Sequence, residues 1–274
     1  MRQHGRLGTA RGLGLGDHAC WIYDDDEGRR GTVADFLADG LRLRQRLLYV
    51  GGDSVERLHA DLEALDGVGS LIEDGALQVV PLRGVGPAGG GIDAERRLEA
   101  YAAATDQAVA EGYTGLRVAV AAGGLVTGSD AWDAHTRWEG LVDRAILSRP
   151  MTALCLYDRR EVPDRVLADI ASVHPISHAP AGMVPFRVFS RPDALALEGE
   201  VDYFSADALG RLLAMTPRGD GEVVLDLSGL GFVDHHGVMA LVEHARKSRP
   251  SHPLRFQKVP YQVERLCDLM GVSL

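Results

Sequence analysis

Cysteine is scarce in this chain of 274 residues. Cys20, Cys155 and Cys267 are the whole set, and they stand far apart with no C-x-x-C pair. Such spacing gives neither a disulfide framework nor a zinc-finger pattern. We therefore expect all three thiols to be reduced.

Long apolar runs and basic clusters are also missing. No run reaches the roughly 18 to 20 residues needed to cross a bilayer, and the N-terminus leads into a glycine-rich stretch rather than a signal peptide. We expect a cytoplasmic protein with no membrane partner. The net charge is −10 and the basic residues are scattered, whereas a sequence-independent nucleic-acid surface needs clustered Lys and Arg. We expect no direct nucleic-acid partner.

A phosphate-binding loop is absent as well. Residues 24–31 read D-D-D-E-G-R-R-G after Tyr23, with no G-K-S or G-K-T, although such a loop needs glycine N–H groups and a lysine. Four carboxylates where a triphosphate would lie repel it unless a metal intervenes. The apolar run 116–121 continues into A-G-G, which offers no acid to hold magnesium. We predict that the protein is not an enzyme, and we assign no catalytic residue, cofactor or metal ligand.

What is present is the pattern of two α/β domains. A hydrophobic fraction of 46% over this length can build two cores. From His18 to Phe189, short apolar runs alternate with amphipathic stretches, which predicts strands and helices on a parallel sheet. The glycine-rich segment 84–91 is typical of a mobile loop. The expected strands are 19–23, 46–50, 77–81, 115–121 and 152–157, and the expected helices are 31–44, 54–66, 93–111 and 130–148.

A smaller α/β domain is predicted to follow, which divides the chain into residues 1–189 and 190–274. Its strands and helices alternate in the same way. The expected strands are 194–197, 222–227 and 254–258, and the expected helices are 205–215, 235–247 and 263–270.

Two pairs of reactive side chains stand on predicted strands of the first domain. His18 and Cys20 are two residues apart and share a face of their strand, as do Cys155 and Tyr157. If the two strands are neighbours, one pocket could hold all four. Such a cluster could bind a soft metal, sense oxidation or line an apolar cavity, and buried cysteines are more often packed than reactive.

Four short motifs carry a resemblance to a known family. They are H-A-C-W-I-Y at 18–23, W-E at 138–139, L-C-L-Y-D at 154–158 and H-P at 174–175. Together they resemble the MEDS domain, the methanogen/methylotroph DcmR-type sensory domain, over roughly residues 11–189. The resemblance implies a degenerate RecA-like module that senses a small-molecule or hydrocarbon-type signal. The family's glutamate after the fourth strand is missing here. The candidate ligand-sensing residues are His18, Cys20, Tyr23, Glu139, Cys155, Tyr157 and His174.

The run D-L-S-G-L-G-F-V-D-H-H-G at 226–237 places the end of a strand against the start of a helix. Unpaired N–H groups and the helix dipole at such a turn favour a phosphoryl group or a partner's carboxylate. The run resembles the phosphorylation-site turn of the STAS domain, D-L-S-x-x-x-F-x-D-S-S-G, and the likeness extends over about 80 residues. Both serines of that pattern are histidine here, His235 and His236.

The substitution removes the serine that ordinary family members phosphorylate, while partner binding around the same turn could survive. Asp234 is expected to cap the helix and Asp202 to fix the neighbouring loop. An alternative is that the two histidines are merely polar residues at an exposed turn. The candidate partner-binding residues are Asp202, Asp234, His235, His236 and Gly237.

We therefore expect a regulatory sensor. Its first domain would sense a cytoplasmic small-molecule or redox signal, and its STAS domain would bind an anti-sigma factor kinase or another STAS protein to control transcription; a homodimer would fit this role. One alternative is a nucleotide-binding phosphotransfer protein with His235 or His236 as phosphoacceptor. Another is a metal or redox sensor acting through His18, Cys20 and Cys155.

Overall fold

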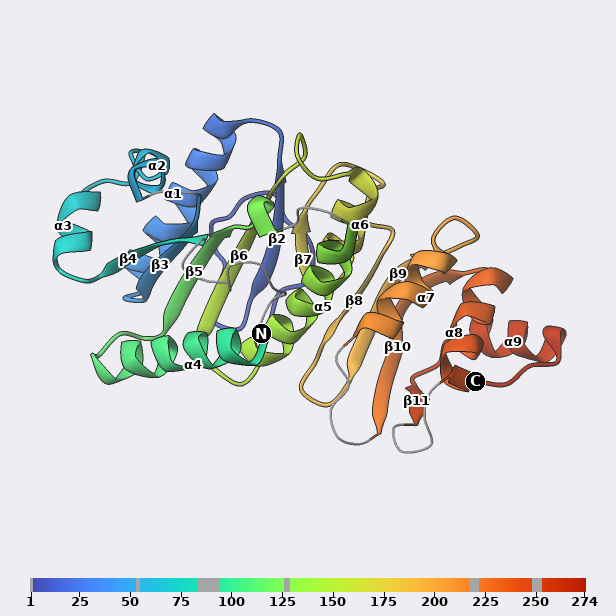
Figure 1. Cartoon of the computed structure of the whole chain (residues 1–274). Helices are drawn as coiled ribbons and strands as arrows, with labels where there is room; N and C mark the ends of the chain where they lie inside the picture. Colours follow the sequence, from blue (N-terminus) through green and yellow to red (C-terminus); the bar gives the residue numbers. More distant parts are fainter. Residues whose placement is uncertain (1, 53–54, 83–93, 126–128, 217–221, 248–252) are drawn as a thin grey trace.

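The chain forms two α/β domains that lie side by side (Figure 1). The computed structural model describes residues 2–52, 55–82, 94–125, 129–216, 222–247 and 253–274. The loop predicted at 84–91 lies outside these residues. None of the described helices combines the length and apolar composition that crossing a bilayer requires.

The first domain is built on a seven-stranded sheet whose described strand pairs are all parallel. The five predicted strands are confirmed, with ends shifted by one residue at most. Two further strands, of two and three residues, are too short for a periodic pattern to show them. In spatial order the strands are β1 (Gly5–Arg6), β7 (Ile176–His178), β2 (His18–Tyr23), β6 (Met151–Asp158), β5 (Leu116–Ala121), β3 (Arg46–Gly51) and β4 (Leu77–Pro81).

Helices cover both faces of this sheet, which gives the domain three layers and two apolar cores (Figure 1). Because side chains alternate along a strand, each central strand contributes to both cores. The first core packs under α4 (Ala94–Ala110), α5 (Ser129–Ile146) and α6 (Asp164–Ser172). The second packs under α1 (Asp26–Arg42), α2 (Val55–Asp61) and α3 (Val68–Glu73).

Helix α1 starts five residues before the predicted position 31. The side chain of Asp25 caps it by accepting the N–H of Gly28 at 2.7 Å. Asp26 and Glu27 then occupy its first turn, where the helix dipole favours negative charge. The acidic run is therefore a helix start, which the pattern of apolar residues alone did not show.

The second domain carries a four-stranded sheet in the order β11-β10-β9-β8. Each predicted strand and helix is present, but β9 and β10 run four and six residues past their predicted ends, and the sheet gains an antiparallel edge strand, β8. The predicted division after residue 189 falls within β8. Its strands are β8 (Phe186–Ser190), β9 (Leu195–Val201), β10 (Val223–Val233) and β11 (Leu254–Gln257), and its helices are α7 (Ala206–Met215), α8 (His235–Lys247) and α9 (Tyr261–Met270).

The two domains meet along β8, which packs against α5 and α6 of the first domain. An ion pair crosses the interface from Arg211 on α7 to Asp169 on α6 at 3.2 Å. The N-terminal residues also join it, since His4 Nδ1 lies 2.8 Å from Glu198 Oε2 on β9. The edge of the second sheet is thereby covered by the first domain.

Candidate functional site

Strands β2 and β6 are neighbours, so the condition for a shared pocket is met. Cys20 pairs in register with Cys155. Because parallel strands in register present matching faces, His18 and Tyr157 project to the same side, beneath α5. The spacing of these residues in the sequence therefore predicted correctly that their side chains lie on one face of the sheet.

Helix α5 adds three polar side chains to this side of the sheet. His135, Glu139 and Asp143 follow each other at spacings of four residues, which places them on one face of the helix. Tyr157 donates its hydroxyl to Glu139 Oε1 at 2.7 Å, and His135 Nε2 lies 2.8 Å from the same hydroxyl. All of these side chains are fully or almost fully buried.

The other carboxylate oxygen of Glu139 is the centre of a compact group. Oε2 lies 3.3 Å from His18 Nε2, 3.5 Å from Cys155 Sγ and 3.4 Å from His174 Nε2. His174 follows α6 in the chain, and its side chain completes the group around Glu139. The ligand atoms of these residues lie within 4.8 Å of one another. We call His18, Glu139, Cys155 and His174 the buried cluster.

Burial and neighbouring charge set the protonation of this group. Burial by itself would raise the pKa of Glu139, but interactions with His135, His174 and His18 hold that pKa well below its usual value. Burial lowers the pKa of His174, and the adjacent His18 lowers it further. His174 is therefore neutral and Glu139 is ionised at neutral pH.

The two cysteines on this side of the sheet are held in the protonated thiol form. Burial, reinforced by the charge of Glu139, raises the pKa of Cys20 and of Cys155 well above the usual range. The thiolate is the form that reacts with oxidants, so a raised pKa slows the oxidation of both side chains. All three cysteines are free and buried, as the reduced-thiol prediction requires.

Two predicted ligand-sensing residues stand apart from the buried cluster. Tyr23 lies on the opposite face of β2 because it is an odd number of residues from His18, and its ring packs near the guanidinium of Arg29 at 5.8 Å. Cys20 lies in the adjoining core and is not one of the four converging residues. Strand parity therefore separates Tyr23 from the buried cluster, whereas Cys20 shares its face of the sheet.

Sequence reasoning missed His135 and Asp143. Their spacing around Glu139 on an amphipathic helix was the signal that could have found them. Asp143 has the larger consequence, because its Oδ1 lies 3.3 Å from His18 Nδ1 while its Oδ2 accepts the backbone N–H of Ser190 at 2.7 Å. Arg2 pairs with the same carboxylate and donates to the carbonyl of Ser190 at 2.6 Å. One side chain therefore joins the buried cluster to β8 of the second domain.

The turn of the second domain has the capping geometry that was predicted. Asp234 Oδ1 accepts the N–H groups of His236 at 2.8 Å and Gly237 at 3.0 Å, while Oδ2 accepts that of Tyr203 at 2.9 Å. Asp202 holds the neighbouring loop by accepting the N–H of Ser205 at 3.0 Å. Both structural roles are confirmed. The carboxylate of Asp234 occupies N–H groups at the start of α8 that an anion would otherwise meet.

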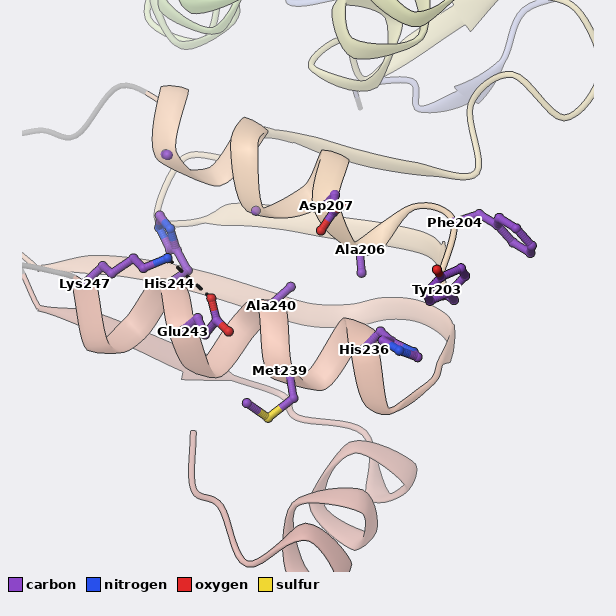
Figure 2. A pocket seen from close by; sticks show the side chains of 12 residues that line it. Tyr203, Phe204, Ala206, Asp207, His236, Met239, Ala240, Glu243, His244 and Lys247 are labelled. Atoms are coloured by element: carbon purple, nitrogen blue, oxygen red, sulfur yellow. Dashed lines mark hydrogen bonds and ion pairs between the residues drawn. The ribbon is translucent and has the colours of Figure 1, made fainter.

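A groove of about 1040 Å³ runs between α7 and α8 beside this turn (Figure 2). Figure 2 shows Tyr203, Phe204 and His236 at one end of it and Lys247 at the other. Tyr203 is 64% exposed and Phe204 87% exposed, which is unusual for large aromatic side chains. Sequence reasoning did not single out these two aromatic residues.

The comparisons with known proteins match both halves of the chain. The family of the methanogen/methylotroph DcmR sensory domain, MEDS, matches residues 17–175, and the family described as Mlab, STAS domain matches residues 188–273. The two domains thus define a regulatory sensory protein. The chain belongs to the MEDS family and carries a C-terminal STAS domain.

No curated protein matches the chain. Among solved structures, the flagellar accessory protein FlaH from Methanocaldococcus jannaschii is similar at 12% identity and a TM-score of 0.36, over 65% of this chain and 72% of that chain. A likeness of this size adds nothing to the fold described above.

Proposed function

We propose that this protein senses a small-molecule or redox signal in the cytoplasm through its MEDS domain and passes it to its STAS domain. The STAS domain binds an anti-sigma factor kinase, or another STAS protein, and thereby controls transcription. The chain acts by binding and is not an enzyme. The MEDS and STAS families support a role in sensing and regulation. The contacts of Asp143 support transfer of a signal between the two domains.

The observation that carries the proposal is the position of Asp143. Its carboxylate contacts His18 of the buried cluster on one side and the backbone of Ser190 on the other. A ligand that displaces His18 would also shift Asp143, whose carboxylate holds β8 in place through the N–H of Ser190. A buried, packed contact of this kind has few intermediate positions, so a small movement at the sensing site can change the docking of the second domain.

The exposed aromatic residues support a protein partner at the STAS turn. Aromatic side chains with large free area are the residues that most often dominate protein interfaces. Phe204 stands at the mouth of the groove within the loop that Asp202 and Asp234 fix. The loop therefore presents an apolar anchor on a rigid support.

The histidine at the phosphorylation position supports control by the first domain. His236 occupies the place where the family pattern has a phosphorylatable serine, so the ordinary serine switch is absent. A partner that docks here needs another source of regulation. The MEDS domain provides one through the β8 interface.

Capture of the partner tests the proposal. The tagged full-length protein is incubated with a cytoplasmic extract of the source cells, and retained proteins are identified by mass spectrometry. We expect a kinase of the anti-sigma factor type or a STAS protein, retained by wild type and lost with Phe204→Ala. Tyr261→Ala on α9, which removes another exposed aromatic residue outside the groove, serves as the control.

Retention of neither partner class by the wild type would contradict the proposal, as would equal retention by Phe204→Ala. Enzymatic activity is tested separately with pure protein, ATP and magnesium. Steady ATP consumption that a single substitution abolishes would overturn the non-enzymatic assignment.

A further inference from the structure

The buried cluster has more lone pairs than protons to satisfy them. His174 Nδ1 lies 2.8 Å from the carbonyl oxygen of Ile170, and because a carbonyl only accepts, this nitrogen carries the ring proton. Its Nε2 then presents a lone pair to Glu139 Oε2 at 3.4 Å. Within the described residues, this fully buried nitrogen has no hydrogen-bond partner.

His18 is arranged in the same way. Its Nδ1 faces Asp143, which fixes a proton there, and its Nε2 faces the carboxylate of Glu139 and the sulfur of Cys155 at 3.6 Å. A second proton on His18 would satisfy Glu139. His174 Nε2 would still have no hydrogen-bond donor. Protonation of His18 alone therefore does not satisfy every buried polar atom of the cluster.

The distances match the edges of a small tetrahedron. Zinc binds nitrogen and oxygen at about 2.0 to 2.2 Å and sulfur at about 2.3 Å, so neighbouring tetrahedral ligand atoms stand about 3.2 to 3.6 Å apart. Around Glu139 Oε2 the observed separations are 3.3, 3.4 and 3.5 Å, and Cys155 Sγ lies 3.6 Å from His18 Nε2. Four of the six distances among these ligand atoms therefore match a tetrahedral zinc site, and the other two are no longer than 4.8 Å.

We propose that the buried cluster binds one Zn²⁺ ion through His18 Nε2, Glu139 Oε2, Cys155 Sγ and His174 Nε2. The mixed set of two imidazoles, a thiolate and a carboxylate suits this borderline ion. On binding, the Cys155 thiol releases its proton to solvent and the sulfur becomes a thiolate ligand. The two negative ligands then neutralise the ion, and the orphaned nitrogen of His174 gains a partner.

Residues around the ligands complete the site. Asp143 accepts from His18 Nδ1, and the Ile170 carbonyl accepts from His174 Nδ1, which fixes both rings with Nε2 toward the ion. Tyr157 donates a hydrogen bond to Oε1 of Glu139, which leaves Oε2 free to bind the metal. The bordering cavity of about 20 Å³ holds no more than about one water, so the site suits an ion better than an organic molecule.

This inference rests on the proposed function, because it names the class of ligand that the sensing site binds. The metal site itself is measured without a partner. Failure of zinc binding leaves partner capture untouched, and failure of capture leaves the metal site untouched, so the two outcomes are distinguishable.

The test uses the full-length protein stripped of metal and titrated with Zn²⁺ and, separately, Co²⁺. We expect about one ion per chain. The cobalt form should show the intense visible bands of a tetrahedral site and a thiolate-to-cobalt charge-transfer band. Cys155→Ala should lose the charge-transfer band, and Cys20→Ala, which removes the neighbouring buried sulfur, should keep it. Asp143→Asn should weaken zinc binding about 10- to 100-fold.

Absence of stoichiometric binding of either ion by the wild type would overturn the proposal, and so would an unchanged cobalt spectrum in Cys155→Ala. If that variant does not fold, X-ray absorption of the zinc-loaded wild type decides. One sulfur and three nitrogen or oxygen neighbours support the site, and any shell without sulfur contradicts it.

Discussion

Asp143 on α5 accepts the backbone N–H of Ser190 on β8 at 2.7 Å. This bond joins a helix of the MEDS domain to the edge strand of the STAS sheet. The same carboxylate is paired with Arg2, and its negative charge is maintained because the charges of Arg2 and His18 outweigh burial and lower its pKa. The bond is thus a charge-assisted contact in a buried interface, where such contacts are strong.

Removal of this carboxylate should destabilise the protein markedly. Asp143→Ala leaves Arg2, His18 and the Ser190 N–H without their shared partner, and breaking a buried pair in this way costs about 3 to 5 kcal/mol. Unfolding in urea measures the loss. Asp106→Ala, which breaks the exposed pair with Arg149, should cost about 1 kcal/mol at most. Similar losses in the two variants would contradict the role given to Asp143.

Gly237 should not tolerate a side chain. A Cβ at this position would lie 2.6 Å from Val233 Cγ2 and 2.9 Å from Val201 Cγ1, so Gly237→Ala should lower the free energy of unfolding by about 1 to 3 kcal/mol. Gly210 on α7 has open space around it, and Gly210→Ala should raise stability by about 0.5 to 1 kcal/mol. Thermal unfolding compares the two, and a stable Gly237→Ala would show that the strand and helix do not meet closely there.

Restoring serine at position 236 should restore phosphorylation. His236 is the second residue of α8 and its side chain is 40% exposed, so a kinase that recognises STAS turns can reach it. Incubation of His236→Ser with such a kinase and ATP should place phosphate on Ser at this position, as read by mass spectrometry. His235→Ser is the matched control and should stay unlabelled at residue 235. Labelling of wild type to the same extent would count against a lost switch.

Acid should weaken the second domain through Asp226. Burial would raise the pKa of this carboxyl, but Lys258 at 2.8 Å and the Ser228 N–H hold it at about 2. The unfolded value is about 3.9. Because the folded pKa is the lower one, the carboxylate stabilises the fold above about pH 4, and this contribution disappears as the pH falls to about 2.

The Asp226→Asn variant measures that contribution. The difference in unfolding free energy between wild type and variant should be full at pH 7 and should shrink between about pH 4 and 2. Asp207→Asn, at an exposed position of α7, is the control. A difference that stays constant across this range would show that Asp226 does not titrate as described.

The sequence predicted the two domains because each depends on local periodicity. The helix at 235–247 and the strands around Cys20 and Cys155 carry clear patterns, and the structure confirms them. The early start of α1 was missed because Asp25 acts through a cap, which is a side-chain contact rather than a pattern of apolar residues. Strand β8 was missed because it pairs with β9 only after the chain folds back.

The candidate site, too, could be predicted only in part from the sequence. Strand parity placed His18 and Cys20 on one face from sequence alone, and the same rule places Tyr23 on the other face. Which strands are neighbours, and which helix lies above them, is a matter of long-range packing. Only that packing brought Glu139 and His174 to the sulfur of Cys155.

The amino-acid order by itself determined the two folded units, their family motifs and the histidines at the STAS turn, because these depend on residues close together in the chain. Tertiary structure alone decided that lone pairs from four separate segments converge and that Asp143 reaches Ser190 of the second domain. The reason is physical: side-chain periodicity is a local property, whereas convergence of ligands depends on how separate strands and helices pack around a shared core.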